Sequence, residues 1–465
     1  MLKTLLNVFS ISELRNKILF TLGMLVVYRI GFWIPLPGVN QSALADYFQQ
    51  ASEQGNALAK AGQFVAVFTG GTFGQSTVFG LGIMPYISAA IIFQILSSVS
   101  PKLKALQQEG PTGRQKIQEW TRYTTVGLCL IQGFAWLQFI SSQGLVYPMW
   151  ANNPFWWAMA IMALTAGAIF LMWLAEQIDR FGIGNGASMI IMAGILAQMP
   201  GAVQWVLGNF EPGGDSDKMG WMGLLMILGG FVLVCAGSVV LTVAQRRIPV
   251  QQAKHTRGRK VFGGQRSYLP LRVNHGGVMP IIFASSLMVF PMVGLQYLSD
   301  AARVSGGSDG VMFGLTTWLA DNLTMGEYLY VLLFVVMVFF FSYFWITVQF
   351  NPEEMSKQLR DHGSFIPGLR PGPRTAEYLE TVMERITYVG AAMLAVIAVL
   401  PMVVNKSLGV DYAVTQFLGG TGLLITVSVT LDFLQRVEAN LMMRNYAGFL
   451  GGADDGKAKR LRGPR

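Results

Sequence analysis

Residues 221–243 read WMGLLMILGGFVLVCAGSVVLTV, a run without a single charged side chain. An α-helix rises 1.5 Å per residue, so a run of this length crosses the roughly 30 Å hydrocarbon core of a membrane. The rest of the chain is similar, because 52% of its 465 residues are hydrophobic and only 13% are charged. Soluble domains carry roughly 25% charged residues. The composition predicts a membrane protein with several spans and excludes a soluble globular protein, a disordered chain, collagen and a small disulfide scaffold.

Similar runs recur along the chain, continuously apolar and without the ten-residue alternation of a transmembrane β-barrel. We expect helices, and we expect the first to be retained, because the stretch FWIPLPGV that follows it is not the small-residue cleavage site of a signal peptide. Cys129 and Cys235 lie inside such runs, so nothing indicates an oxidising compartment. The predicted spans are residues 19–36, 78–98, 122–141, 155–175, 185–204, 221–243, 275–297, 329–349, 386–404 and 417–436.

Lysine and arginine are distributed unevenly between the predicted connections. If the N-terminus is cytoplasmic, 29 of the 34 lysines and arginines lie in segments on the cytoplasmic side. Short cytoplasmic connections of membrane proteins carry this excess. A wrong number of spans would mix the two sides, so the distribution predicts ten spans with both termini in the cytoplasm.

The ten predicted spans divide five and five around residues 206–219. Because five is odd, a duplicated five-span unit enters the membrane from the opposite side the second time, and inverted repeats place a pathway at the interface between the halves. The sequence shows us no similarity between the halves, so this expectation rests on hydropathy symmetry alone. We expect an N-terminal half over 1–205, a C-terminal half over 206–437 and a basic cytoplasmic tail over 438–465.

Two cytoplasmic connections, 245–274 and 351–385, are much longer than a turn between helices requires. The first is strongly basic and contains QRRIPVQQAKHTRGRK followed by QRSYLPLR. Ordinary positive-inside bias explains part of this charge. The length favours a docking surface, and anionic lipid, ribosomal RNA or an acidic protein face would each respond to clustered cations.

The segment FVAVFTGGTFGQST at 64–77 is apolar but too short and too rich in glycine to cross a membrane by itself. Two interpretations fit it. It is either a re-entrant piece whose backbone is satisfied by surrounding protein, or a loop at the membrane interface.

Catalytic motifs are not convincing anywhere in the chain. GGADDGK at 451–457 has the spacing of a phosphate loop, but Ala458 stands where that loop needs Ser or Thr. The string GGSDG at 306–310 lies in a polar connection without a strand-turn-helix setting. The three histidines are scattered without metal-ligand spacing, and Arg29 lies near a span end, where its charge can reach the interface. We therefore expect no catalytic residue, no metal and no cofactor, and a passage that does not bind its cargo through charge.

Six ordered strings closely resemble the SecY family, the pore subunits of the bacterial protein-conducting channel (SecY/Sec61-alpha). The resemblance covers essentially the whole chain. The strings are FGLGIMPYISAAIIFQIL (79–96), LAEQIDRFGIGNGASMII (174–191), RRIPVQQAK (246–254), LPLRVNHGGVMPIIFASS (269–286), FIPGLRPGPRTAEYL (365–379) and GGTGLLITVSVTLDF (419–433).

The resemblance implies an all-α polytopic membrane protein whose two five-span halves form a clam shell around a central pore. It also implies a ring of aliphatic side chains at the waist of that pore, which resists wetting and ion leak without gripping a particular sequence. Ala187 is smaller than the other members, so the ring is expected to be looser there. The residues matched to the ring are Ile83, Ile87, Ala187, Ile191, Ile282 and Ile425.

By the same resemblance, residues 64–77 correspond to a plug that closes the outer funnel, with Phe64, Phe68, Gly70, Gly71 and Gly74. Ser88 and Phe290 match facing positions of a lateral gate, through which signal sequences reach the lipid. The two long cytoplasmic connections correspond to partner-docking loops. The docking residues expected there are Arg246, Arg247, Arg257, Arg259, Lys260 and Arg370.

The implied function is a passive, gated channel for unfolded polypeptides in the cytoplasmic membrane of a bacterium. The partners implied are the subunits SecE and SecG, the SecA ATPase, the ribosome with its RNA, signal peptides, nascent chains and membrane lipids. Two other classes are weighed against it. A secondary solute transporter also uses inverted repeats but needs a polar site at mid-membrane, and a non-conducting scaffold needs only the basic loops.

Overall fold

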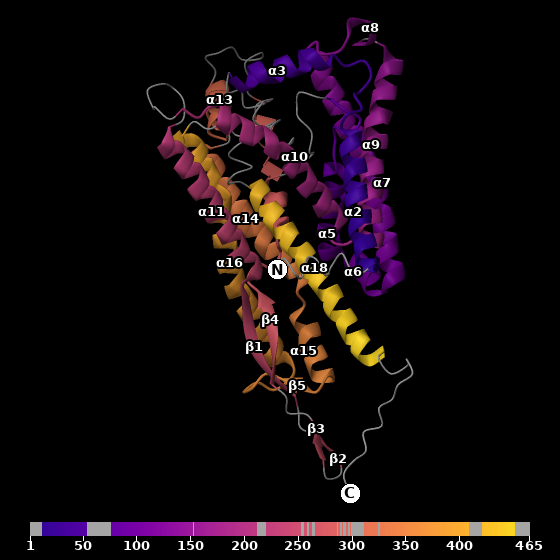
Figure 1. Ribbon diagram of the computed structural model, residues 1–465, viewed down its shortest axis with the longest axis vertical. Coiled ribbons are helices and arrows are strands. Elements are labelled where there is room, and N and C mark those ends of the chain that lie inside the picture. Colours follow the sequence, from indigo (N-terminus) through magenta and orange to yellow (C-terminus); the bar gives the residue numbers. More distant parts are fainter. Residues whose placement is uncertain are drawn as a thin grey trace.

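The computed structural model describes residues 12–53, 76–151, 153–211, 220–252, 255–257, 260–262, 266–285, 287–288, 291, 294–295, 298, 311–323, 326–408 and 421–451. The described chain is mostly helical (Figure 1). The predicted plug residues Phe64, Phe68, Gly70, Gly71 and Gly74 lie outside the described residues, as do Phe290 and Arg259.

The helices follow one another in the order of the predicted spans, with shorter helices between them. In the first half they are α2 (Ser12–Gly31), α3 (Gln41–Glu53), α5 (Met84–Val99), α6 (Pro101–Gln108), α7 (Pro111–Ser142), α8 (Pro148–Ala151), α9 (Pro154–Phe181) and α10 (Gly186–Gly208). In the second half they are α11 (Trp221–Val243), α13 (Val311–Asn322), α14 (Tyr328–Gln349), α15 (Pro352–Asp361), α16 (Pro373–Leu408) and α18 (Thr421–Gly451).

Proline and asparagine define many of the helix starts. Helices α5, α6, α7, α9 and α15 each carry proline at the first or second position, where the missing N–H has no intrahelical partner to lose. Asn153, Asn185 and Asn351 cap α9, α10 and α15, each accepting a hydrogen bond from a backbone N–H of the first turn. These starts are local properties of the sequence.

Among the described residues, six helices are long and apolar enough to cross a membrane, or seven if the bent pair α5–α6 counts as one span. Helix α2 overlaps the first predicted span over residues 19–31, but its 20 residues contain Arg15, Lys17 and Arg29. Helix α18 coincides with the tenth and contains Asp432 and Arg436. These charged residues are the reason that α2 and α18 are not counted among the six helices apolar enough to cross a membrane. The total of ten spans stays a prediction.

Three predicted span boundaries are wrong. The span expected from residue 78 becomes helical only at Met84, after a turn over 78–83. The first span was expected to continue to residue 36, yet α2 ends at Gly31 and residues 32–34 form a turn before Pro35 pairs with Thr77. The span expected from residue 275 becomes helical only at 279, after a turn over 275–278 in which Gly277 has a φ of 59°. In all three places proline or glycine interrupts helix formation inside an apolar run.

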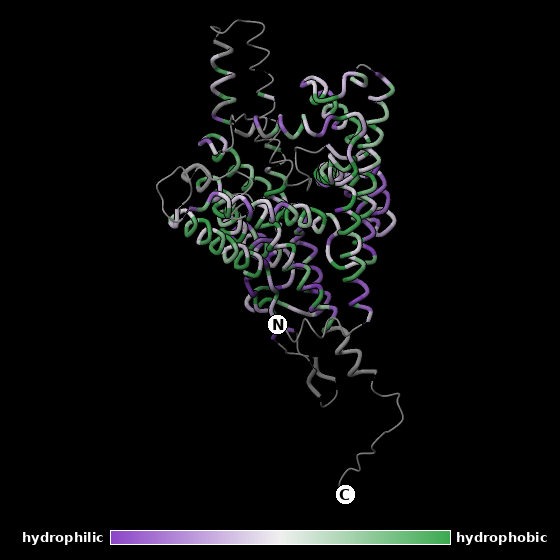
Figure 2. Tube along the Cα trace, turned by 45° about the horizontal axis from the view of Figure 1, so that its top comes forward, coloured by the Kyte–Doolittle hydropathy of each residue, from purple (hydrophilic) through white to green (hydrophobic). Residues whose placement is uncertain are grey.

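The helices of the two halves stand side by side. In Figure 1, α2, α7 and α9 lie on one side and α11, α14 and α16 on the other, with α10 and α18 between them. Hydrophobic residues predominate along most of this helical body (Figure 2). The largest buried cluster contains residues of α2, α5, α9, α10, α11, α14, α16 and α18, so it joins both halves.

The two long connections that were predicted to be cytoplasmic contain strands, whereas the predicted all-α fold class assumed plain loops. Strands β1 (Gln245–Gln252), β4 (Arg266–Arg272) and β5 (Ser364–Phe365) form an antiparallel sheet in the order β4-β1-β5. Strands β2 (His255–Arg257) and β3 (Lys260–Phe262) extend this hairpin. Ile248, Val250 and Leu271 are buried against Leu379 and Met383 of α16, so the sheet rests on a helix that continues out of the predicted span.

Candidate functional site

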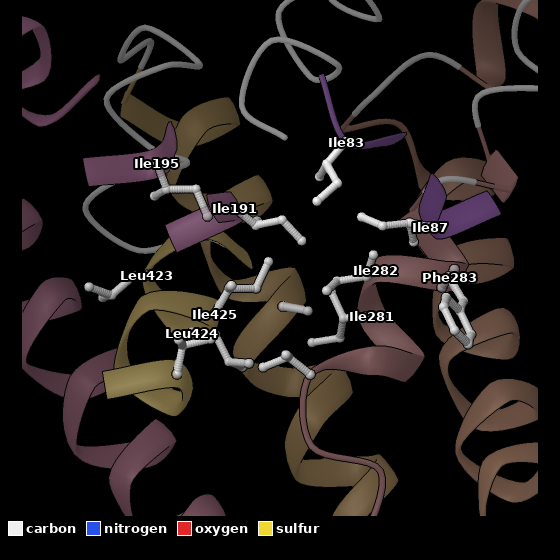
Figure 3. Close-up of a cluster of buried hydrophobic side chains, with 14 of the residues drawn as sticks. Ile83, Ile87, Ile191, Ile195, Ile281, Ile282, Phe283, Leu423, Leu424 and Ile425 are labelled. Carbon is white, nitrogen blue, oxygen red and sulfur yellow. The ribbon is translucent and has the colours of Figure 1, made fainter. Parts of the chain in front are cut away.

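Five isoleucines matched to the ring lie in one buried cluster. Their exposed fractions are at most 8%, and that of Ile425 is 0%. Figure 3 shows their side chains directed toward a common centre from three separate helices, α5, α10 and α18, and from the helical residues 279–285. Ala187, the sixth matched residue, is half-buried and packs against the same cluster. The five isoleucines are Ile83, Ile87, Ile191, Ile282 and Ile425.

The turn before α5 places the first two isoleucines. Gly82 has a φ of 57°, and its N–H donates to the carbonyl of Phe79 at 2.8 Å, which closes a turn that favours glycine. Ile83 is the N-cap residue of α5, and the N–H of Ile87 donates to the Ile83 carbonyl at 3.1 Å. Residues four apart lie on one face of a helix. Both side chains therefore point into the cluster.

A polar network holds the start of α10 against α9. The Asp179 carboxylate accepts a hydrogen bond of 2.7 Å from the N–H of Gly186, and Asn185 caps the helix. A Cβ at Gly186 would lie 2.0 Å from the Ala175 carbonyl oxygen, so only glycine allows this approach. Ala187 and Ile191 follow one turn apart on the resulting helix face.

Ile282 and Ile425 also lie within the first turns of their helices. The side-chain amide of Asn274 donates to the Gly277 carbonyl at 2.8 Å, and the N–H of Ile282 donates to the Val278 carbonyl at 3.1 Å. Next to it, the ring of Phe283 packs edge-on against Phe341 and Trp345 of α14, with centroids 5.7 and 5.3 Å away. Ile282 is thus supported from behind by aromatic packing.

A small pocket of about 290 Å³ with both polar and apolar lining residues lies next to the cluster, between α10, α11, α14, α18 and the 272–279 segment. Arg436 pairs with Asp432 at 2.8 Å, and Arg272 donates to the side-chain oxygen of Gln435 at 3.0 Å. Burial, and then the nearby Arg272 charge, lower the pKa of His275 below its ordinary value. Charged and polar side chains of this pocket therefore lie next to hydrophobic residues of the cluster.

The predicted docking residues that the structure describes lie on the strands and in the loop beside them. Arg246 and Arg247 are exposed on β1, and Arg257 pairs with Lys260 across the β2–β3 hairpin. Arg370 is exposed in a loop fixed at both ends, where Gly368 and Gly372 have positive φ and the Gly372 carbonyl accepts from Ser356 at 2.8 Å. Of the predicted gate, Ser88 is half-buried on α5.

The sequence prediction missed several members of the cluster. Ile195 lies one turn after Ile191 on α10, and Leu424 precedes Ile425 on α18. The four-residue spacing could have indicated Ile195. Leu424 could not be identified this way, because every residue around it is also apolar.

Comparisons with known proteins agree on one family. The family model described as SecY matches residues 77–434. The protein translocase subunit SecY of Chlamydia trachomatis is 39% identical over 463 residues, covering 96% of this chain and 98% of the relative, and that of Streptomyces griseus is 40% identical over 451 residues, covering 95% and 98%. Two solved structures, a protein-conducting channel and Sec61 in a canine ribosome–channel complex, align over 95% of both chains with TM-scores of 0.56 and 0.55 at 16% identity, which concerns the fold alone.

Proposed function

This chain belongs to the SecY family of protein translocase subunits, and on that premise we propose how it works as a protein-conducting channel in a bacterial membrane. The ring isoleucines form a dry constriction at the waist of the pore. Hydrocarbon surface in a narrow passage resists wetting and so opposes ion flow. It also makes no directional contact, so it admits chains of any sequence. The observation that carries this proposal is the convergence of isoleucines from four distant chain segments on one centre.

The opening movement separates the two halves of the clam shell. Ten spans in two inverted halves, with both termini cytoplasmic, account for the charge distribution of the connections. The plug at 64–77 closes the outer side of the ring in the resting channel. The lateral gate at Ser88 and Phe290 releases signal sequences and transmembrane segments into the lipid.

Energy comes from partners that dock on the sheet. The expected docking residues carry positive charge on the β1–β4 hairpin and the 366–372 loop, which suits ribosomal RNA and the acidic surface of a motor such as SecA. The solved Sec61 and yeast Ssh1 relatives are bound to ribosomes. SecE and SecG complete the complex, ATP hydrolysis belongs to SecA, and this chain is not itself an enzyme.

Photocrosslinking tests the proposal. A photoreactive amino acid at Ile282 or Ile425 is expected to capture a stalled secretory chain, and one at Phe290 its signal segment. The control positions are Leu225 and Val232 on α11, which are 62% and 63% exposed and face outward. Capture at the control positions but not at the two isoleucines would refute the channel. The solute-transporter alternative predicts no capture at any of these positions.

A further inference from the structure

Residues 76–83 connect two parts that must behave differently during gating. They begin with the last two residues of the predicted plug segment, 64–77, and lead to Ile83, the first isoleucine matched to the ring. The plug has to leave the pore, whereas the ring has to keep its shape around the passing chain. This inference rests on the proposed function. It concerns how movement of the plug is kept from disturbing the ring.

Ser76 is held by side chains from two other helices. The side-chain amide of Gln41, the first residue of α3, donates to the Ser76 carbonyl at 2.8 Å and accepts from the Ser76 N–H at 2.9 Å. The indole N–H of Trp136 on α7 donates to the Ser76 hydroxyl at 3.1 Å. The Leu36 N–H also donates to the Ser76 carbonyl, at 2.9 Å. Gln41 therefore pairs with this backbone as a neighbouring strand would.

The site is buried, which increases the cost of breaking these bonds. Ser76 is 1% exposed and Thr77 is 4% exposed. A buried backbone group that loses its partner keeps the full cost of its desolvation. Asn40 fixes the start of α3, since its side-chain oxygen accepts from the Ala43 N–H at 3.2 Å. Gln41 is thus presented by a helix start that is itself anchored.

The next residues are fixed by close packing. The Val78 N–H donates to the Ile34 carbonyl at 3.1 Å, and a Cβ added at Gly167 of α9 would lie 2.2 Å from the Val78 carbonyl oxygen. The ring of Phe79 stacks on Phe170 with centroids 5.9 Å apart. This part of the chain has no room to follow a moving plug.

We propose that Gln41 and Trp136 are positioning residues that clamp the end of the plug segment at Ser76. Ile83 then keeps its place in the ring independently of the position of the plug. Loss of the clamp lets plug motion reach Ile83 and loosens the resting seal.

The test compares matched variants in the reconstituted translocase complex, with the resting ion conductance of lipid bilayers and the thermal unfolding temperature as readouts. Gln41→Ala removes the two bonds to the Ser76 backbone, and Trp136→Phe removes the bond to its hydroxyl. Each is expected to raise resting conductance about tenfold, the change that about 1.4 kcal/mol of lost closed-state preference produces. Trp136→Phe and Ser76→Ala remove the same bond, so the double variant is expected to leak no more than either single one.

The controls separate clamping from general stability. Gln50→Ala removes an exposed glutamine of α3, and Trp157→Phe removes an indole bond of 3.1 Å to the Ala151 carbonyl in the same part of the fold. Neither is expected to leak, even where Trp157→Phe lowers the unfolding temperature as much as Trp136→Phe does. If Trp157→Phe leaks equally, the clamp is refuted.

Deletion of residues 64–74 distinguishes a failed clamp from a failed plug. A leak in the deletion without a leak in Gln41→Ala and Trp136→Phe refutes the clamp and leaves the plug standing. If the deletion itself does not leak, the plug assignment is wrong and the clamp falls with it.

Discussion

Replacing Ile425 with alanine is expected to open the resting channel without unfolding it. Ile425 is fully buried at the centre of the cluster, and the substitution removes three carbon atoms from it. At about 0.8 kcal/mol for each buried carbon the loss is about 2.4 kcal/mol, near the lower end of the range of about 2 to 5 kcal/mol for such truncations in protein cores. If these contacts exist only while the ring is closed, the closed-to-open ratio falls about fiftyfold, since about 1.4 kcal/mol corresponds to a factor of ten.

The assay is the resting ion conductance of the reconstituted complex in a planar bilayer, without a translocating chain. Ile425→Val removes one carbon, so it is expected to shift the same ratio only about fourfold. Ile140→Ala is the control, because Ile140 is also 0% exposed but belongs to a separate cluster between α3, α7 and α9. It is expected to lower the unfolding temperature without leak. Equal unfolding shifts and no leak in either alanine variant would show that the isoleucines are ordinary core residues.

Two further predictions concern the cytoplasmic side. Arg246→Gln is expected to weaken binding to ribosomes or to the SecA motor about fivefold at low salt and less at high salt, because a basic residue near an anionic surface contributes about 1 kcal/mol. The matched control is Arg15→Gln, on an exposed part of α2. Equal binding by both variants would contradict the docking assignment. Burial and the Arg272 charge lower the pKa of His275 in the folded state, so the unfolded chain binds more protons below about pH 6.5 and stability is lost as the pH falls. The unfolding temperature is expected to drop toward pH 5, and His275→Gln is expected to flatten that slope. An unchanged slope in this variant would contradict the role given to His275.

The membrane class could be predicted because charge is almost absent from long runs such as 221–243, and the structure has an unbroken helix there. The sheet formed by β1, β4 and β5 was missed for a physical reason. Its β1 strand carries proline at 249, which argues against a central strand, and only Ile248 and Val250 of that strand are buried. Two buried residues produce too little alternation to separate a strand from a polar loop.

The ring register is harder still, because hydropathy alone marks none of its members. Ile83 and Ile87 stand in a segment where most neighbours are equally apolar, and nothing local distinguishes a residue facing the centre from one facing lipid. The resemblance supplied the positions, and the fold brings five of them together. Helical periodicity adds one piece of information. Once one residue of α5 or α10 is known to face the centre, the residue four positions later is expected to face it too.

Each ring isoleucine lies at the helix start or within the first turns of its helix, and this placement explains how a seal can be both firm and deformable. At a helix start the chain direction is set by a turn or a cap, such as Gly82 before α5 and Asn185 before α10. A small rotation of the helix about that point moves a side chain near it very little, whereas it moves the far end a long way. In the proposed opening movement, separation of the two halves is therefore expected to change the spacing between the isoleucines gradually. This explanation requires the chain before each isoleucine to be rigid. Before α5, the hydrogen bonds of Gln41 and Trp136 to Ser76 hold the chain in place.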